Sequence, residues 1–207
     1  IMDSYLHQLT AVILTYKTNL DILKNCLKSI NSKVKILIVE NSSNFKYLKE
    51  IQSNFSNIEV ICSGSNLGYG GGNNFGLNKV KTNYALILNP DTVCEDNFFS
   101  NVNKYLSGNI DFTLIGATYN NKTDFKPAGF FNKKDLKSAQ FDKESNLYEV
   151  DWIVGHTILF NMKKFSNNKN YFVDFIRLNN IRYIVSFNKL GIPKCIETKH
   201  VGKLEHF

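Results

Sequence analysis

The sequence predicts an α/β domain with a mainly parallel central sheet and helices on both faces. Three observations support this: short apolar runs rich in β-branched residues recur, helix-like stretches separate them, and a polar cluster follows each run. The 207 residues, of which 43% are hydrophobic and 21% charged, are enough for one substantial core. We therefore expect a single domain of the α/β class.

Strands and helices alternate along the first half of the chain. The predicted strands are Thr10–Tyr16, Val34–Glu40, Ile58–Cys62 and Tyr84–Leu88. The predicted helices are a stretch with Leu20, Leu23, Leu27 and Ile30 at helical spacing, then Phe45–Phe55 and Asn73–Val80. A capping box, Thr18-Asn19-Leu20-Asp21, marks the start of the first helix. This alternation implies parallel strands, because each helix returns the chain to the same end of the sheet.

The second half of the chain is less regular. We expect a helix over Asn97–Leu106 and strands over Phe112–Thr118 and Ile153–Phe160. The polar stretch Asn120–Glu149 predicts loops or a hairpin. The aromatic-rich stretch Phe172–Leu190 predicts a helix that a Gly-Ile-Pro sequence ends.

Polar residues follow all of the predicted strands in the first half. They are Thr15-Tyr16-Lys17, Glu40-Asn41-Ser42, Ser65-Asn66 and Asn89-Pro90-Asp91. Ligands of parallel sheets bind beyond the carboxyl ends of the strands, so these residues are candidates for a binding site. Glu40 can accept a hydrogen bond from a nucleoside base or a ribose hydroxyl, or it can simply begin an Asn-Ser-Ser turn.

The segment Asn89-Pro90-Asp91-Thr92 directly follows a buried strand. Pro90 cannot continue the ladder and restricts the backbone, so Asp91 is expected at the edge of the sheet. A carboxylate there can hold Mg²⁺ or Mn²⁺ that also binds phosphate oxygens and neutralises charge on a diphosphate leaving group. The alternative is a simple turn, because Asn, Pro and Asp are all turn formers.

A glycine cluster, Gly68-Tyr69-Gly70-Gly71-Gly72, precedes the third predicted helix. Consecutive glycines let the backbone approach a ligand closely, and the following helix N-terminus favours an anion. A dinucleotide fingerprint needs G-x-G-x-x-G after the first strand, whereas this cluster follows the third and has Asn73 in place of the last glycine. The other interpretation of the cluster is a flexible loop that binds nothing.

The net charge of +7 favours acidic partners such as anionic lipid or phosphorylated small molecules. Nucleic acid is not expected, because the lysines are scattered and no RNA-binding, zinc-finger or basic heptad signature occurs. The four cysteines form no C-x-x-C pair, and neither a transmembrane run nor a signal-peptide pattern is present. We expect a reducing, cytoplasmic location without disulfides. The 16 phenylalanines leave room for a patch in peripheral contact with the inner membrane face.

Taken together, these segments resemble the large inverting nucleotide-sugar glycosyltransferase family with the A-type fold, and within it the bacterial rhamnosyltransferase-like branch. The shared pattern is A-V-I-L-T-Y at 11–16, I-L-I-V-E-N-S-S at 36–43, N-L-G-Y-G-G-G-N-N-F-G at 66–76 and L-I-L-N-P-D at 86–91. The segments W-I-V-G at 152–155 and F-V-D-F at 172–175 are similar to the acceptor-side strand and the F-I-D-Y stretch of that family. The resemblance covers residues 9 to 202.

The resemblance implies a single Rossmann-like nucleotide-binding domain over residues 1–207. Its nucleotide-binding half would cover about residues 1–95, and its acceptor-side half about residues 96–207. The residues that the resemblance assigns to the donor are Thr15, Tyr16 and Glu40 at the nucleoside, Asn66, Gly70, Gly71 and Asn73 along the ribose, diphosphate and sugar, and Asn89 and Asp91 at the D-x-D position. Asp91 would bind Mg²⁺ or Mn²⁺. His200 would complete the metal or diphosphate site, or it is a surface histidine near the terminus.

The sequence departs from the family pattern where the general base is expected. The family has an acidic cluster after the F-I-D-Y stretch, but residues 176–183 contain no acid. An inverting transfer needs a carboxylate to take the proton of the acceptor hydroxyl. Asp174 is the nearest carboxylate and the expected base, with Asp151 as the alternative. Glu40 and Asn89 also replace the usual aspartates of the family.

The implied activity is metal-dependent, inverting transfer of a sugar from a nucleoside-diphosphate donor, such as dTDP-rhamnose or a UDP-sugar, to a growing cell-surface polysaccharide. The acceptor would be a glycan or a lipid-linked glycan. Because the usual base cluster is missing, a second interpretation is a sugar-nucleotide-binding domain with little or no catalysis. An NAD-dependent oxidoreductase is a third and more distant interpretation.

Overall fold

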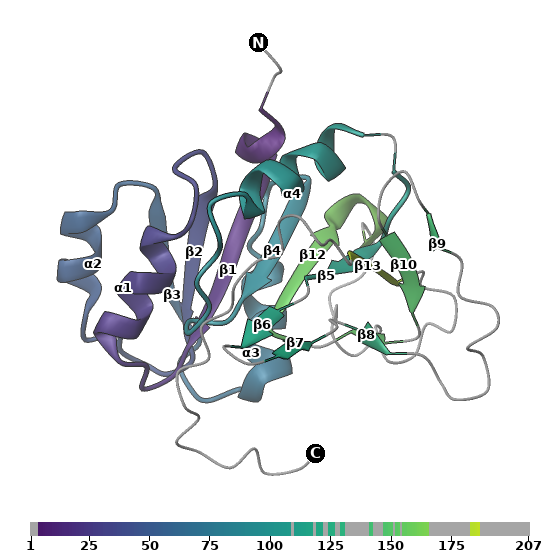
Figure 1. Ribbon diagram of the computed structural model, residues 1–207. Coiled ribbons are helices and arrows are strands. Elements are labelled where there is room, and N and C mark those ends of the chain that lie inside the picture. The colour runs from purple at the N-terminus through teal and green to yellow at the C-terminus, as the bar shows by residue number, and fades with distance from the viewer. Residues whose placement is uncertain are drawn as a thin grey trace.

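The computed structural model has a nine-stranded sheet at its centre (Figure 1). The structure describes residues 4–108, 110–117, 119–121, 124–126, 129–130, 141–142, 147–150, 152–153, 155–165 and 183–186. The sheet has the strand order β3-β2-β1-β4-β12-β5-β13-β10-β9. Two small two-stranded sheets, β11-β8 and β6-β7, accompany it.

The strands of the central sheet are β1 (Leu9–Thr15), β2 (Lys35–Glu40), β3 (Ile58–Cys62), β4 (Tyr84–Leu88), β5 (Leu114–Gly116), β9 (Phe141–Asp142), β10 (Leu147–Val150), β12 (Thr157–Asn161) and β13 (Tyr183–Ser186). The small sheets contain β6 (Tyr119–Asn121), β7 (Asp124–Lys126), β8 (Gly129–Phe130) and β11 (Trp152–Ile153). Strands β1 to β4 run parallel, whereas β12 lies antiparallel between β4 and β5. The sheet is therefore parallel on the β3 side and mixed beyond β4.

The α-helices are α1 (Leu20–Lys28), α2 (Leu48–Asn54), α3 (Gly68–Leu77) and α4 (Phe98–Ser107), and the 3₁₀ helices are η1 (Tyr5–Gln8) and η2 (Met162–Phe165). Among the described residues, none of the helices combines the length and the apolar character needed to cross a bilayer.

Alternate residues of the central strands face two separate hydrophobic layers. Ala11 and Ile13 of β1 pack with residues of α1, α2 and α4. Val12, between them in the sequence, packs on the other face with Leu77 of α3 and Phe165 of η2. This arrangement explains why the strands are nearly continuous apolar runs, and it confirms the predicted α/β class with helices on both faces.

Three local predictions differ from the structure. The N-cap of α1 is Asn19 and not Thr18: the Asn19 Oδ1 accepts from the backbone nitrogens of Asp21 at 2.8 Å and Ile22 at 3.3 Å. The glycine cluster is not a loop before a helix, because α3 begins at Gly68 and includes the cluster. Residues 183–186, predicted to be helical, form strand β13, because they pair with both β5 and β10. The other residues of the predicted helix lie outside the described part of the chain.

Candidate functional site

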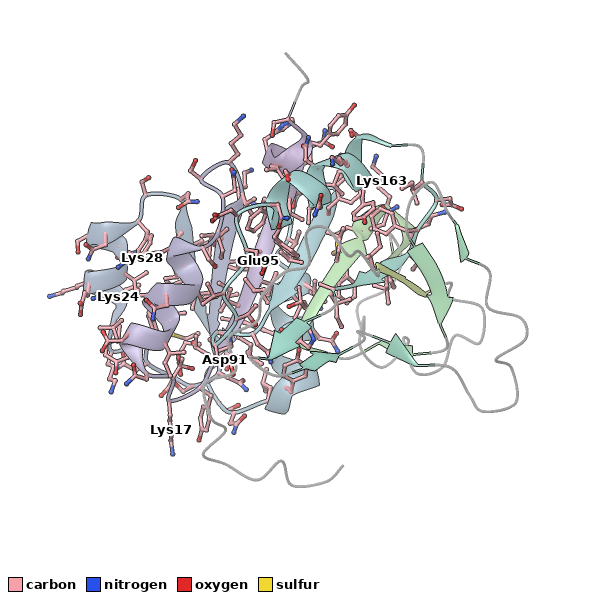
Figure 2. The ribbon with its side chains drawn as sticks, in the orientation of Figure 1. Lys17, Lys24, Lys28, Asp91, Glu95 and Lys163 are labelled. Carbon is pink, nitrogen blue, oxygen red and sulfur yellow. The ribbon has the colours of Figure 1, made fainter. Side chains whose placement is uncertain are left out.

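The carboxyl ends of the parallel strands meet at one edge of the sheet. Figure 2 shows Asp91 and Lys17, which follow β4 and β1, at this edge, and Lys163 near the opposite edge. The predicted site residues that follow β1, β2 and β4 are therefore brought together, as expected for a parallel sheet.

The Glu40 carboxylate, at the end of β2, is buried and fixed by two hydroxyls. Thr15 Oγ1 donates to one carboxylate oxygen at 2.7 Å, and Ser42 Oγ donates to the other at 2.6 Å. Glu40 is only 6% exposed. Each carboxylate oxygen can accept more than one hydrogen bond, so the group can still accept from an N–H or O–H of a ligand. Thr15 is fully buried and orients Glu40.

Asn41, the next residue, organises the loop between β3 and α3. Its amide nitrogen donates to Asn66 Oδ1 at 2.9 Å and to the Gly68 carbonyl at 3.2 Å. Its Oδ1 accepts from the Leu67 backbone nitrogen at 2.9 Å and from Ser63 Oγ at 3.2 Å. Asn66 Oδ1 is therefore used within the protein, and it also accepts from the backbone nitrogen of Gly68 at 2.9 Å. The sequence predicts Asn41 as one of the polar residues after a strand, but it does not predict these contacts.

Two glycines of α3 face the sheet and not a ligand. A Cβ on Gly76 would lie 2.6 Å from Val12 Cγ1 and 2.7 Å from Val39 Cγ2. A Cβ on Gly72 would lie 2.4 Å from Leu14 Cδ1. The backbone of α3 thus approaches β1 and β2 closely. At Gly72, the absence of a side chain serves this packing, which corrects both the expected approach to a ligand and the alternative of a flexible loop.

The predicted donor residues Gly70, Gly71 and Asn73 lie in the first turns of α3. Gly71 is exposed and Gly70 is partly buried, whereas Asn73 is fully buried. The Asn73 Nδ2 donates to the Tyr69 carbonyl at 3.0 Å, and its Oδ1 has no hydrogen-bond partner among the described residues. Asn73 therefore lies beneath the surface of the site, with an unused acceptor.

The segment after β4 forms the predicted turn, with the Thr92 nitrogen donating to the Asn89 carbonyl at 3.0 Å. The Asn89 nitrogen donates to the His156 carbonyl at 2.9 Å, which joins the turn to the start of β12. Asp91 is partly buried. Its carboxylate makes no hydrogen bond or ion pair with any residue that the structure describes. A carboxylate held at a strand end without a protein partner is available to a cation.

Tyr69 and His156 lie around this turn. Burial raises the pKa of Tyr69 well above its usual range, the Asn73 side chain opposes the shift, and the Asp91 charge adds to it. Burial lowers the pKa of His156 to about 4, so the imidazole is neutral near pH 7. The His156 Nδ1 lies 3.0 Å from Thr157 Oγ1.

Tyr16 and Lys17 follow β1 at the exposed rim of the site. Tyr16 is 44% exposed, and Lys17 Nζ lies 5.2 Å from the centre of its ring. Lys17 has a φ of +52°, in the left-handed region that a residue with a side chain rarely adopts. An exposed ring and a cation at the rim suit a planar, anionic ligand.

The residues at this edge fit a divalent cation that is shared with a ligand. Within the described part of the chain, no three His, Cys, Asp or Glu side chains gather into a metal site. Mg²⁺ commonly binds proteins through one or two carboxylates and completes its shell with substrate phosphates and water, so Asp91 alone suits it. His200, Asp174 and Asp151 lie outside the described residues.

Known proteins share sequence or fold with this chain. Residues 10–168 match the family Glycosyl transferase family 2. The low-salt glycan biosynthesis hexosyltransferase Agl10 of Haloferax volcanii is 36% identical over 95 residues, which are 44% of this chain and 30% of that protein. The chain thus aligns with less than a third of this curated relative.

Two solved structures share the fold. One is S. aureus TarS 1-349, with a TM-score of 0.60 and 12% identity, covering 91% of this chain and 60% of that one. The other is GalNAc-T7 with UDP, GalNAc and Mn²⁺, with a TM-score of 0.59 and 13% identity, covering 86% of this chain and 41% of that one. At these identities the likeness establishes the fold and not the substrate.

Proposed function

Since the chain belongs to glycosyl transferase family 2, we propose that it transfers a hexosyl or deoxyhexosyl group from a nucleoside-diphosphate donor to a growing cell-surface glycan. The hexosyltransferase relative from Haloferax volcanii supports a hexosyl donor. The rhamnosyltransferase-like pattern at residues 66–76 and 86–91 supports a deoxyhexosyl donor such as dTDP-rhamnose. We further propose that the acceptor is a glycan or lipid-linked glycan, used in the cytoplasm or at the inner membrane face.

The observation that carries this proposal is the state of Asp91. Its carboxylate lies at the carboxyl end of β4 and makes no hydrogen bond or ion pair with any described residue. A partly buried charge without a protein partner is unfavourable, and a divalent cation compensates it. When bound, Mg²⁺ or Mn²⁺ would neutralise charge on the departing diphosphate. Asp91 would hold the ion, with His200 as a second candidate ligand.

The nucleoside would lie between Glu40 and Tyr16. The fixed Glu40 carboxylate accepts hydrogen bonds, which suits the imide N–H of uracil or thymine, or a ribose hydroxyl. The exposed Tyr16 ring offers a flat surface for the base. Asn66, Gly70 and Gly71 would follow the ribose, diphosphate and sugar towards Asn89, with the buried Asn73 beneath them. This arrangement uses residues 1–95 for the donor and leaves residues 96–207 for the acceptor.

The transfer itself needs a base. In the inverting reaction that we propose, the acceptor hydroxyl attacks the anomeric carbon while a carboxylate takes its proton and the nucleoside diphosphate leaves with the bonding pair. Asp174 is the proposed base and Asp151 the alternative. Asp174→Asn should lower turnover about 10²–10⁴-fold with nearly unchanged nucleotide affinity. Full activity of this variant would move the base to Asp151 or another carboxylate.

Thermal unfolding in the presence of nucleotide tests the proposed function. UDP or dTDP at about a hundred times its dissociation constant should add about 2.7 kcal/mol to the unfolding free energy when Mg²⁺ or Mn²⁺ is present. The same nucleotides should have much less effect in EDTA. An equal shift in EDTA would contradict a metal-bridged diphosphate.

The second candidate function is donor binding without transfer, which the absence of acids at 176–183 favours. A panel of nucleotide sugars, incubated with glycan and lipid-linked acceptors, separates the two. Product formation supports the transferase. A chain that binds a donor yet forms no product with any acceptor, and releases no free sugar, supports the binding domain.

A further inference from the structure

Tyr69 joins three segments that are far apart in the sequence. It lies in the first turn of α3, and its hydroxyl donates to the carbonyl oxygen of Gly155, which precedes β12. The same hydroxyl lies 3.3 Å from Asn89 Oδ1, directly after β4. An ideal Cβ on Gly155 would lie 3.4 Å from the Tyr69 ring, so the ring packs directly over the Gly155 backbone.

The hydroxyl orients Asn89 as well as Gly155. A phenol has one proton to donate and lone pairs that accept. The proton goes to the closer acceptor, the Gly155 carbonyl. The Asn89 amide can then rotate to present its NH₂ group to the phenol oxygen, since the two ends of an amide are interchangeable in shape. In either amide orientation, the Asn89 side chain contacts the hydroxyl.

The contact of the Tyr69 hydroxyl with Asn89 also affects Asp91, because Asn89 begins the turn that contains Asp91. The backbone of Asn89 is bonded on one side to the His156 carbonyl and on the other to the Thr92 nitrogen. Asp91 lies within this turn, and its charge adds to the raised pKa of the Tyr69 phenol. The bonds at Asn89 and Gly155 fix the position from which the Asp91 carboxylate projects.

We propose that Tyr69 is a positioning residue, whose hydroxyl holds the Asn89–Thr92 turn against Gly155 and thereby places the Asp91 carboxylate for a metal-bound diphosphate. The inference rests on the proposed function in one respect, namely that Asp91 binds the metal. It assigns to Tyr69 no contact with the donor. Removal of the hydroxyl should therefore weaken the metal-dependent part of nucleotide binding and spare the nucleoside part.

Tyr69→Phe removes only the hydroxyl. The matched control is Tyr84→Phe at the other end of β4, where the Tyr84 ring stacks on Phe112 with centroids 6.0 Å apart. We measure the affinity for UDP and dTDP with Mn²⁺, and for uridine and thymidine without metal. In Tyr69→Phe, the diphosphate affinity should fall roughly 10-fold, as expected for one lost buried hydrogen bond, with nucleoside affinity changed less than about 2-fold. The control should change neither affinity.

Two outcomes of the binding experiment overturn the proposal. Equal weakening of diphosphate and nucleoside binding would mean that the hydroxyl supports the fold in general. Unchanged diphosphate affinity would mean that the turn keeps its position without the hydroxyl.

A measurement without ligand separates this proposal from the proposed function. Amide hydrogen exchange at Asn89 and Thr92 in the free chain should be roughly 10-fold faster in Tyr69→Phe and unchanged in Tyr84→Phe. If wild-type protein bound neither nucleotide with any metal, the proposed function would fail, and exchange alone would decide whether Tyr69 holds the turn. Unchanged exchange in Tyr69→Phe would overturn the inference.

Discussion

Glu40 at the end of β2 and Asp91 just after β4 lie at the same edge of the sheet, but only the Glu40 carboxylate is hydrogen-bonded to other described residues. Glu40 is 6% exposed and receives hydrogen bonds from Thr15 and Ser42. Asp91 is partly buried and has no hydrogen-bond or ion-pair partner among the described residues.

The difference separates two kinds of recognition. A carboxylate that is fixed by hydroxyls has a defined orientation, and it can accept hydrogen bonds from N–H or O–H groups of an uncharged part of the ligand, such as a nucleoside. A carboxylate without a partner is suited to a cation, whose coordination shell the ligand then completes. Variants of Asp91 and Glu40 test whether the two ends of the site are energetically separate.

Asp91→Asn should abolish metal-dependent binding of UDP or dTDP. A neutral amide is a poor ligand for Mg²⁺, and the residue lies in a turn, so stability should stay within about 0.5 kcal/mol of wild type. Titration calorimetry with Mn²⁺ and thermal unfolding measure both quantities. Asp96→Asn, which changes an exposed acid of the same connection, is the matched control. Unfolding of Asp91→Asn, or undiminished binding, would show that the segment is only a structural turn.

Glu40→Gln should weaken nucleoside binding about 10- to 100-fold, because hydrogen bonds to a charged group contribute about 1.5–3 kcal/mol. The remaining binding of UDP or dTDP should keep its dependence on Mn²⁺. Calorimetry with uridine or thymidine, and with the diphosphate in metal or EDTA, provides the comparison. Loss of the metal dependence in this variant would mean that the two ends of the site are coupled.

Gly76→Ala should destabilise the protein by about 1–3 kcal/mol, the usual cost of overpacking a tight contact. The added methyl would meet Val12 and Val39, which are both fully buried. Urea unfolding measures the change. Gly71→Ala, on the exposed side of α3, is the comparison and should cost less, because its added methyl would lie 3.1 Å from Leu67 Cβ and would not meet the sheet. Wild-type stability in Gly76→Ala would show that α3 shifts easily on the sheet. Tyr69, in the first turn of α3, would then be less firmly positioned than Glu40, which two hydroxyls fix.

Stability should fall as the pH is lowered from 7 to 5, because His156 has a pKa of about 4 in the folded protein and about 6.5 when unfolded. Between these values the unfolded chain binds more protons, so unfolding becomes easier as the pH falls. The contribution of His156 is about 1–2 kcal/mol over this interval. Chemical unfolding of wild type and His156→Gln at both pH values isolates it. An identical pH dependence in the two proteins would refute the assignment.

The regular part of this fold is predictable because its signals are local. The bounds Ile58–Cys62 and Tyr84–Leu88 are the same in prediction and structure, since each apolar run ends at polar residues. The sequence places Thr15, Glu40 and Asp91 at one edge for the same reason. Strand alternation alone brings the carboxyl ends together.

The remaining features depend on contacts that no local pattern encodes. Residues 183–186 are a strand because β5 and β10 supply partners on both sides. Asn41 holds the loop before α3 because its amide nitrogen donates to Asn66 and Gly68, which are far away in the sequence. Tyr69 meets Asn89 and Gly155 only once α3 has packed on the sheet. The roles proposed for Asp174 and His200 stay predictions.

The composition of α3 has a consequence for local unfolding. Half of its sequence, GYGGGNNFGL, is glycine, and each glycine in a helix interior costs about 0.8–1 kcal/mol relative to alanine. Such a segment does not hold a helix by itself, so its order comes from its contact with the sheet. We expect α3 to open at a lower free energy than the strands beneath it. A ligand that binds against the first turn of α3 would then stabilise the whole helix, and part of its binding free energy would be spent on ordering that helix. Occupancy of the site would appear as slower amide exchange along α3, far beyond the atoms that the ligand touches.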